Sequence, residues 1–145
     1  MTHKDSGKYA EKHPSTAEIN PLIAKEIEKY SSSGSISCID AHSISTSLNI
    51  EPTDIGVMID LSEKRISRCQ LNLFGHGKGK PENIPAKSID DGIKKDIYGN
   101  LDENKKISCL ACWKIADIKG LSKVEITSIC EGLEIKITAC QLGAF

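Results

Sequence analysis

The chain has 145 residues, a formal net charge of −1 and a sequence pI near 6.4. Hydrophobic residues make up 39% and charged residues 27%, the balance of one ordinary soluble domain or of two small ones. No apolar run is long enough for a membrane span and no secretory signal opens the chain, so we expect a cytoplasmic protein with no membrane partner. The near-neutral charge also argues against a dedicated nucleic-acid binder, which is usually more basic.

The first half of the chain begins with residues 1–17, which are polar and predict a disordered tail. Residues 18–30 carry apolar side chains at three- and four-residue spacing, the pattern of an amphipathic helix. A short strand is then expected at 36–38, helices at 39–48 and 53–62, and a strand at 64–71. Asn49 and Pro52 predict the turn between the two helices, because Asn tolerates the left-handed conformation that ends a helix and Pro is tolerated where the next begins.

The second half repeats this pattern after residues 76–88, which are rich in Gly, Pro and Lys and predict a flexible linker. A helix is expected over 89–98, a short strand at 107–109, helices at 110–119 and 122–132, and a strand at 133–142. The order of elements is therefore the same in both halves.

Residues 36–74 and 107–145 align without a gap at a spacing of 71 positions. They share 11 identities in 39 positions, whereas unrelated segments would share roughly two or three by composition. We therefore predict one unit used twice, as repeat 1 over residues 18–75 and repeat 2 over residues 89–145. The two should superpose with Cys38 over Cys109 and Cys69 over Cys140, in an α+β, mainly α fold.

The two middle helices of each repeat resemble a helix-turn-helix. In repeat 2, Ala116 is followed four positions later by Gly120, and apolar residues follow inside the second helix. Two helices that cross steeply touch at one point, so a small residue is needed there, and Gly accepts the backbone conformation of the turn. Repeat 1 has Ser45 and Asn49 at these positions. With the flanking helix and strands, each repeat resembles a winged helix.

Resemblance to winged helices implies a DNA-binding transcriptional regulator that places the second helix of each pair in the major groove of double-stranded DNA. The sequence shows no nucleophile–base pair and no acid pair at catalytic spacing, so we expect no enzymatic activity. Acidic residues on the second helix of repeat 1 oppose this, so basic residues around the helices must anchor the duplex. The candidate DNA-binding residues are Thr53, Arg65, Arg68, Lys78, Lys80, Lys114, Lys119, Lys123 and Thr127. Repeat 2 has the more balanced charge and is expected to carry more of the affinity. The alternative is a protein-interaction adaptor that binds a protein partner on the same scaffold.

The cysteines allow a third interpretation, a thiol-based metal or redox sensor. Four thiolates suit zinc or an iron–sulfur cluster, and the candidate set is Cys109, Cys112, Cys130 and Cys140. However, Cys109 and Cys140 have counterparts in repeat 1, which favours small buried core residues. We therefore expect no bound metal and no cofactor. The target DNA sequence, the effector and the oligomeric state are left open by the sequence.

Overall fold

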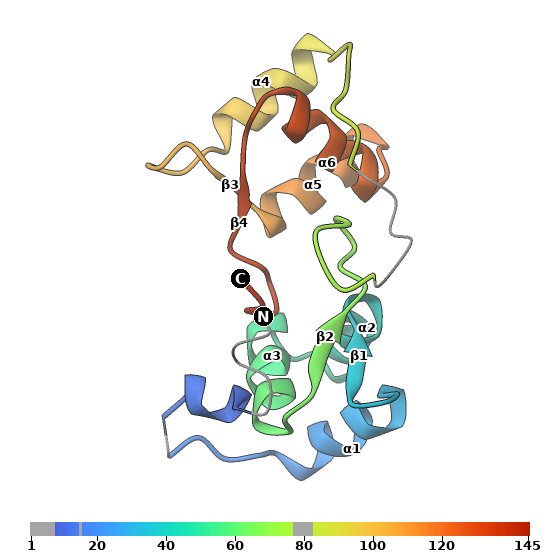
Figure 1. The fold of residues 1–145 in the computed structure, drawn as a ribbon, viewed down its shortest axis with the longest axis vertical. Helices are drawn as coiled ribbons and strands as arrows, with labels where there is room; N and C mark the ends of the chain where they lie inside the picture. Colours follow the sequence, from blue (N-terminus) through green and yellow to red (C-terminus); the bar gives the residue numbers. More distant parts are fainter. Residues whose placement is uncertain (1–7, 15, 77–82) are drawn as a thin grey trace. The chain divides into compact units, whose positions relative to one another are not determined.

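The computed structural model describes residues 8–14, 16–76 and 83–145 (Figure 1). Regular structure in these residues consists of six α-helices, one short 3-10 helix and four short strands. The expected α+β, mainly α fold class is confirmed. This part of the chain contains no helix with the length and apolar character needed to cross a bilayer.

The chain divides into two compact units, which are described separately. Unit 1 comprises residues 1–69 and 141–145, and unit 2 comprises residues 70–140. The elements of unit 1 are η2 (Tyr9–Lys12), α1 (Pro21–Tyr30), β1 (Ser35–Ser37), α2 (Cys38–Leu48), α3 (Pro52–Leu61) and β2 (Arg65–Ser67). Those of unit 2 are α4 (Asp91–Gly99), β3 (Ile107–Ser108), α5 (Cys109–Lys119), α6 (Lys123–Gly132) and β4 (Ile137–Thr138).

The elements of the two units correspond at the predicted spacing of 71 residues. Helices α2 and α5 both begin at the predicted cysteine pair, Cys38 and Cys109, and both have 11 residues. Helices α3 and α6 have 10 residues each and also begin 71 positions apart. Cys69 and Cys140 each follow a residue with positive φ. The helices and strands of the two units therefore follow in the same order at the same spacing.

Each unit contains one pair of parallel strands. Ile36 of β1 lies opposite Ile66 of β2, and Ile107 of β3 lies opposite Ile137 of β4. Strands joined by a hairpin would be antiparallel, whereas parallel strands need a crossover connection. Here the crossover is the helix pair itself. Each unit is therefore a strand–helix–helix–strand arrangement, in which the described strands do not form a hairpin wing.

The same local chemistry sets the helix boundaries in both units. The Ser37 and Ser108 hydroxyls begin α2 and α5, each accepting a hydrogen bond of 3.1 Å from the backbone N–H three residues later. Asn49 and Gly120 end these helices in the left-handed conformation, with φ of +53° and +69°. Side-chain capping satisfies N–H groups that a helix start leaves unpaired, and a left-handed residue closes the other end. The turn that we predicted from Asn49 is confirmed.

The core of both units is built largely from isoleucine. Fully buried isoleucines recur at matching positions of the two repeats, as Ile36 and Ile107 on the first strands and Ile55 and Ile126 on the second helices. Burying such a side chain contributes about 1.5–3 kcal/mol relative to leaving it exposed. The periodic apolar pattern specified the inward faces only in part, because Leu22 and Ile39 of the expected apolar faces are 59% and 55% exposed.

The prediction of a disordered tail over residues 1–17 is wrong for residues 9–13. Tyr9 is only 3% exposed, and the backbone N–H groups of Tyr9 and Ala10 donate to the Glu63 carboxylate at 3.0 and 2.6 Å. The composition of this segment gave no sign of order, because its placement depends on contacts with α3, 50 positions away in the chain. Residues 1–7 and 15 lie outside the described part.

The predicted flexible linker is likewise wrong for its second part. The Asn83 side chain donates to the Asn72 carbonyl and accepts from the Asn72 side chain, both at 2.9 Å. The Ala86 N–H donates to the Ser128 carbonyl, also at 2.9 Å. These hydrogen bonds fix residues 83–86 against unit 2. Residues 77–82 of the predicted linker lie outside the described part.

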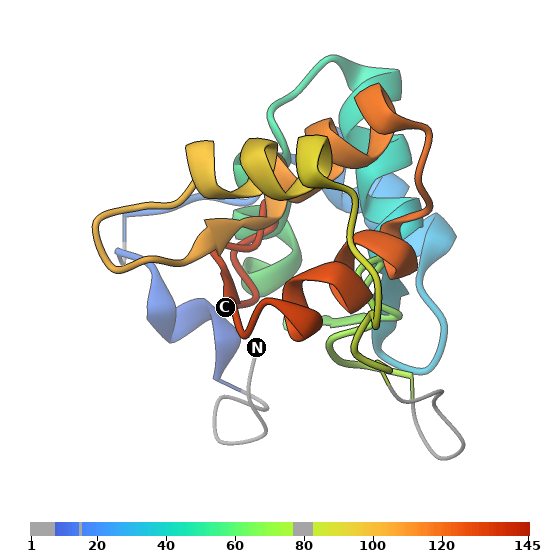
Figure 2. The same cartoon turned by 90° about the horizontal axis from the view of Figure 1, so that it is seen from above.

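The tails of the two repeats are exchanged. Residues 141–145, the end of repeat 2, belong to unit 1, and residues 70–75, the end of repeat 1, belong to unit 2. In both views the last residues, in red, lie beside α3, in green (Figures 1 and 2). The predicted domain boundaries kept each tail with its own repeat, and the structure places both in the opposite unit.

Candidate functional site

The helix pair of unit 2 has the connection expected of a helix-turn-helix. Three residues, 120–122, join α5 to α6, and such motifs use a turn of three or four residues. The Ser122 hydroxyl accepts from the Glu125 N–H at 3.1 Å, and the Glu125 carboxylate accepts from the Ser122 N–H at 3.3 Å. This capping box satisfies two N–H groups at the start of α6 and so defines where the helix begins.

Helix α6 is exposed at its first turn and again at Glu131 and Gly132 at its end. Ile126, Thr127, Ile129 and Cys130 are buried, whereas Val124 is 47% exposed. The segment at Ala86 packs against the end of the helix, where its carbonyl oxygen would lie 2.7 Å from a Cβ added at Gly132. The N-terminal turn is therefore the end of α6 that no neighbouring segment approaches so closely.

Three of the predicted contact residues lie on α5 and at the start of α6, where Asp117 and Glu125 are also exposed. Lys114 and Lys119 are exposed on α5, and Lys119 pairs with Asp96 at 3.3 Å. The Lys123 ammonium lies 4.4 Å from the centre of the Trp113 ring. This cluster, Lys114, Lys119, Lys123 and Trp113, is called the α5–α6 basic cluster below.

The remaining predicted contacts are more scattered. Thr53, Arg65 and Arg68 are exposed in unit 1, but Glu51 and Asp54 lie beside Thr53 at the start of α3. Unit 1 contains 8 Lys and Arg against 10 Asp and Glu, whereas unit 2 contains 11 against 10. Lys78 and Lys80 lie outside the described residues. The structure thus places the densest group of predicted contacts in unit 2, where the sequence charge favoured it.

The prediction that Thr127 contacts DNA is wrong. Its side chain is 0% exposed, and its hydroxyl donates to the Leu71 carbonyl at 2.9 Å. Thr127 was a candidate contact because it lies on the second helix of the pair, but the exchanged tail of repeat 1 packs over it. A buried, hydrogen-bonded hydroxyl cannot reach a base edge.

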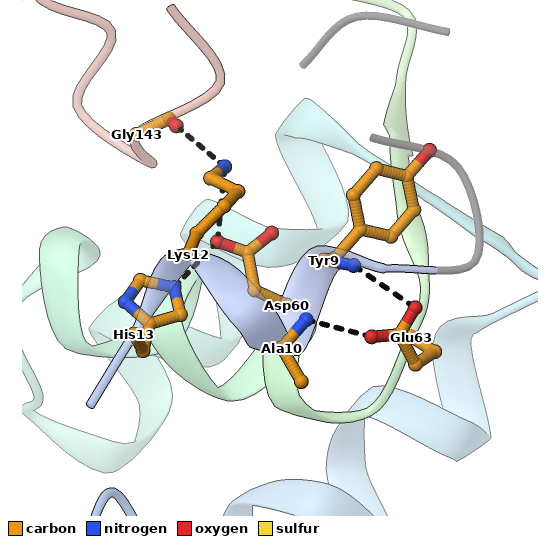
Figure 3. Close-up of polar contacts among 7 residues, drawn as sticks. All are labelled: Tyr9, Ala10, Lys12, His13, Asp60, Glu63 and Gly143. Carbon is orange, nitrogen blue, oxygen red and sulfur yellow. Dashed lines mark hydrogen bonds and ion pairs between the residues drawn. The ribbon is translucent and has the colours of Figure 1, made fainter. Parts of the chain in front are cut away.

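A polar cluster in unit 1 was missed by the sequence analysis (Figure 3). Asp60, at the end of α3, is 2% exposed. One of its oxygens contacts Lys12 at 3.2 Å and His13 at 2.8 Å, and Lys12 also donates to the Gly143 carbonyl at 3.4 Å. The other Asp60 oxygen has no hydrogen-bond partner among the described residues. The cluster joins the N-terminal segment, α3 and the exchanged tail.

A sequence signal for this cluster did exist. Carboxylates near a helix C-terminus are unfavourable, because that end carries partial negative charge. Asp60 and Glu63 at the end of α3 therefore call for donors, and the preceding segment contains Lys12 and His13. The corresponding residue of unit 2, Glu131, is exposed and has no ion pair within the described ranges.

The cysteines do not assemble into a metal site. Within the described residues, no three His, Cys, Asp or Glu side chains are placed to hold a metal ion. Cys112 and Cys130 are hydrogen-bonded to each other and are 0% and 1% exposed. That hydrogen bond, followed by burial, raises the pKa of Cys112, whereas accepting it lowers the pKa of Cys130 against the effect of burial. Cys140 is the partly exposed member of the proposed ligand set.

No protein-family model, curated protein or solved structure matches this chain. Its function is therefore inferred from the geometry of the two units. The feature with the most definite chemistry is the α5–α6 basic cluster, because cationic side chains, an open helix start and a defined turn meet there.

Proposed function

We propose that the protein is a non-enzymatic, DNA-binding transcriptional regulator, or the DNA-reading part of one, and that unit 2 contacts the duplex. The observation that carries this proposal is the α5–α6 basic cluster beside the open first turn of α6. Lysine contacts to phosphate supply most of the affinity of such proteins, and the N-terminal residues of the second helix contact base edges. The resemblance of each repeat to a winged helix is part of the proposal.

The cover over α6 restricts how the duplex can be bound. Ala86 and Gly132 approach closely at the second half of the helix, so the full length of α6 cannot lie in a groove while this contact persists. Binding through the first turn, with Lys114 and Lys119 on neighbouring phosphates, requires only that Lys119 exchange its Asp96 partner for a phosphate. Unit 1 contributes at most Arg65 and Arg68 to the contacts with the duplex, because the start of α3 is acidic.

Fluorescence anisotropy with random-sequence duplexes tests the proposal. With three lysine contacts, the logarithm of the binding constant should fall with the logarithm of salt concentration with a slope of about −3. Lys123→Glu should weaken binding at least about tenfold, the loss that corresponds to one charge-assisted contact. Lys106→Glu is the matched control, because it makes the same charge change at an exposed residue between α4 and β3. Absence of binding at micromolar protein in low salt, or equal losses in both variants, would refute the proposal.

The second candidate is a protein-interaction adaptor, and one observation favours it. Ile118, near the end of α5, is 79% exposed, and Val124 at the start of α6 is 47% exposed. A phosphate backbone gains little from such apolar side chains, whereas an apolar partner surface would bury them. Replacing both with serine leaves the charge of the cluster intact. If the double variant binds the duplex as tightly as the parent protein, the DNA-binding function is supported. If the parent protein binds no duplex, the adaptor function is supported.

A further inference from the structure

Lys123 occupies an unfavourable position for a cation. It is the first residue of α6, and the N-terminus of a helix carries partial positive charge that favours anions. The corresponding residue of unit 1 is Pro52, which is well suited to the first position of a helix. Unit 2 therefore departs from a local rule that unit 1 obeys. Such departures are expected at functional positions.

The Trp113 ring stabilises the Lys123 cation at this unfavourable position without neutralising its charge. The Lys123 ammonium lies 4.4 Å from the ring centre, within the distance at which the negative face of an aromatic ring attracts a cation. A carboxylate partner, such as the one that Asp96 gives Lys119, would neutralise the charge instead. Because the ring approaches from one side and an ammonium has three N–H donors, Lys123 can still donate to an anion.

The pair is specific to unit 2. The counterpart of Trp113 in unit 1 is His42, and Trp113 is the single tryptophan of the chain. Trp113 and Lys123 are both half-buried, so the long lysine side chain is held by packing as well as by the ring. Holding it in advance lowers the conformational entropy that would otherwise be lost on contact with a ligand.

We propose that Lys123 is a DNA phosphate contact and that Trp113 is the residue that positions it. This inference rests on the proposed DNA-binding function and names the specific residue pair that carries it. The capping box satisfies the Ser122 and Glu125 N–H groups, and the lysine side chain adds three N–H donors at the start of the helix.

A double-mutant cycle tests the pair in the full-length protein. One change is replacement of the single tryptophan by a ring-fluorinated analogue, which withdraws electron density from the ring face and alters its shape little. The other change is Lys123→Ala. Anisotropy with a fluorescent random-sequence duplex is measured for all four proteins across a salt series, and circular dichroism checks that each is folded.

Fluorination should weaken duplex binding about two- to fivefold in the parent protein and should have no effect in the Lys123→Ala background. Lys123→Ala alone should reduce the steepness of the salt dependence by about 0.9, the value for one phosphate contact. An unchanged salt slope, or equal effects of fluorination in both backgrounds, would overturn the role of the pair while leaving DNA binding in place. A parent protein that binds no duplex would overturn the proposed function as well, so the two failures are distinguishable.

Discussion

The two units accept the same tail by different means. In unit 1 the carbonyl oxygen of Leu142 lies where a side chain at Gly56 would have to be. In unit 2 the corresponding residue is Thr127, and its hydroxyl donates to the carbonyl of Leu71, the counterpart of Leu142. One unit makes room for the peptide backbone and the other forms a hydrogen bond with it.

This difference shows which part of the repeat is constrained and which part is free. The tail must present a carbonyl to the second helix in both units, so Leu71 and Leu142 are both buried. The helix residue beneath it can be very small or can be a donor. The two units diverge further at the surface, where Glu51 and Asp54 flank the start of α3 whereas α6 begins with Lys123 and has Glu125 in its first turn.

The largest effect is expected from closing the space in unit 1. Gly56→Ala places a methyl group on the Leu142 carbonyl, and overpacking of this kind costs up to about 3 kcal/mol, or more where backbone must move. Urea denaturation followed by circular dichroism measures the loss. The matched control is Gly99→Ala in α4, where an added Cβ meets no atom within 4 Å, so stability should not fall. Equal stability of the Gly56→Ala and parent proteins would show that the tail does not lie on α3.

Removing the donor in unit 2 should have a smaller effect. Thr127→Val keeps the size of the side chain but leaves the buried Leu71 carbonyl without the hydroxyl, at a cost of about 1–2 kcal/mol. Hydrogen exchange should become faster around residues 70–75 while α2 and α3 stay protected. Faster exchange throughout both units would contradict a local role for this hydrogen bond.

A smaller loss of stability is expected when the charge of Asp60 is removed, and none when that of its counterpart Glu131 is removed. Asp60→Asn removes the charge that Lys12 and His13 share, and because those side chains are 28% and 20% exposed, we expect a loss of about 1 kcal/mol. The segment over residues 8–14 should then be cleaved faster by trypsin at Lys12. Glu131→Gln changes the corresponding residue of unit 2 and should leave stability unchanged. A loss of similar size in both variants would show that the contacts of Asp60 in Figure 3 contribute nothing.

The smallest expected difference between the two units is in the reactivity of a cysteine thiol and not in stability. Cys140 is partly exposed, whereas its counterpart Cys69 is 5% exposed. Brief treatment of the native protein with iodoacetamide should therefore alkylate Cys140 well before Cys69, and mass spectrometry of the peptides reports the order. Labelling of both at the same rate would show that the two strand ends are equally accessible.

The sequence predicted the elements of the fold better than their connections. Helix boundaries followed from local chemistry, such as the left-handed residues Asn49 and Gly120, and the register of the repeats followed from identities such as Cys69 and Cys140. The exchange of tails was not predictable in this way. Both tails begin with the same Gln-Leu sequence after a cysteine, so either would suit either unit, and the local pattern carries no information about which unit is chosen.

The candidate site was predicted in part. Lys114, Lys119 and Lys123 could be recognised as basic residues near a turn, and the structure brings them to one helix pair. The pairing of Lys123 with Trp113 was not foreseen, because residues ten positions apart on different helices meet only after the turn is formed. Thr127 was misassigned because it was chosen for lying on the second helix of the pair, and a distant segment packs over it.

The exchanged tails have a consequence for deletion mapping and for the exchange of segments between related genes. A truncation after Cys140 removes residues from repeat 2, yet the helix that loses its cover is α3 of unit 1. A phenotype caused by such a truncation would be assigned to the wrong half of the gene. Chimeras joined in the middle of the chain would likewise separate each helix pair from the tail that completes it. Boundaries at Cys69/Gln70 and Cys140/Gln141 keep the physical units intact, although they cut across both repeats.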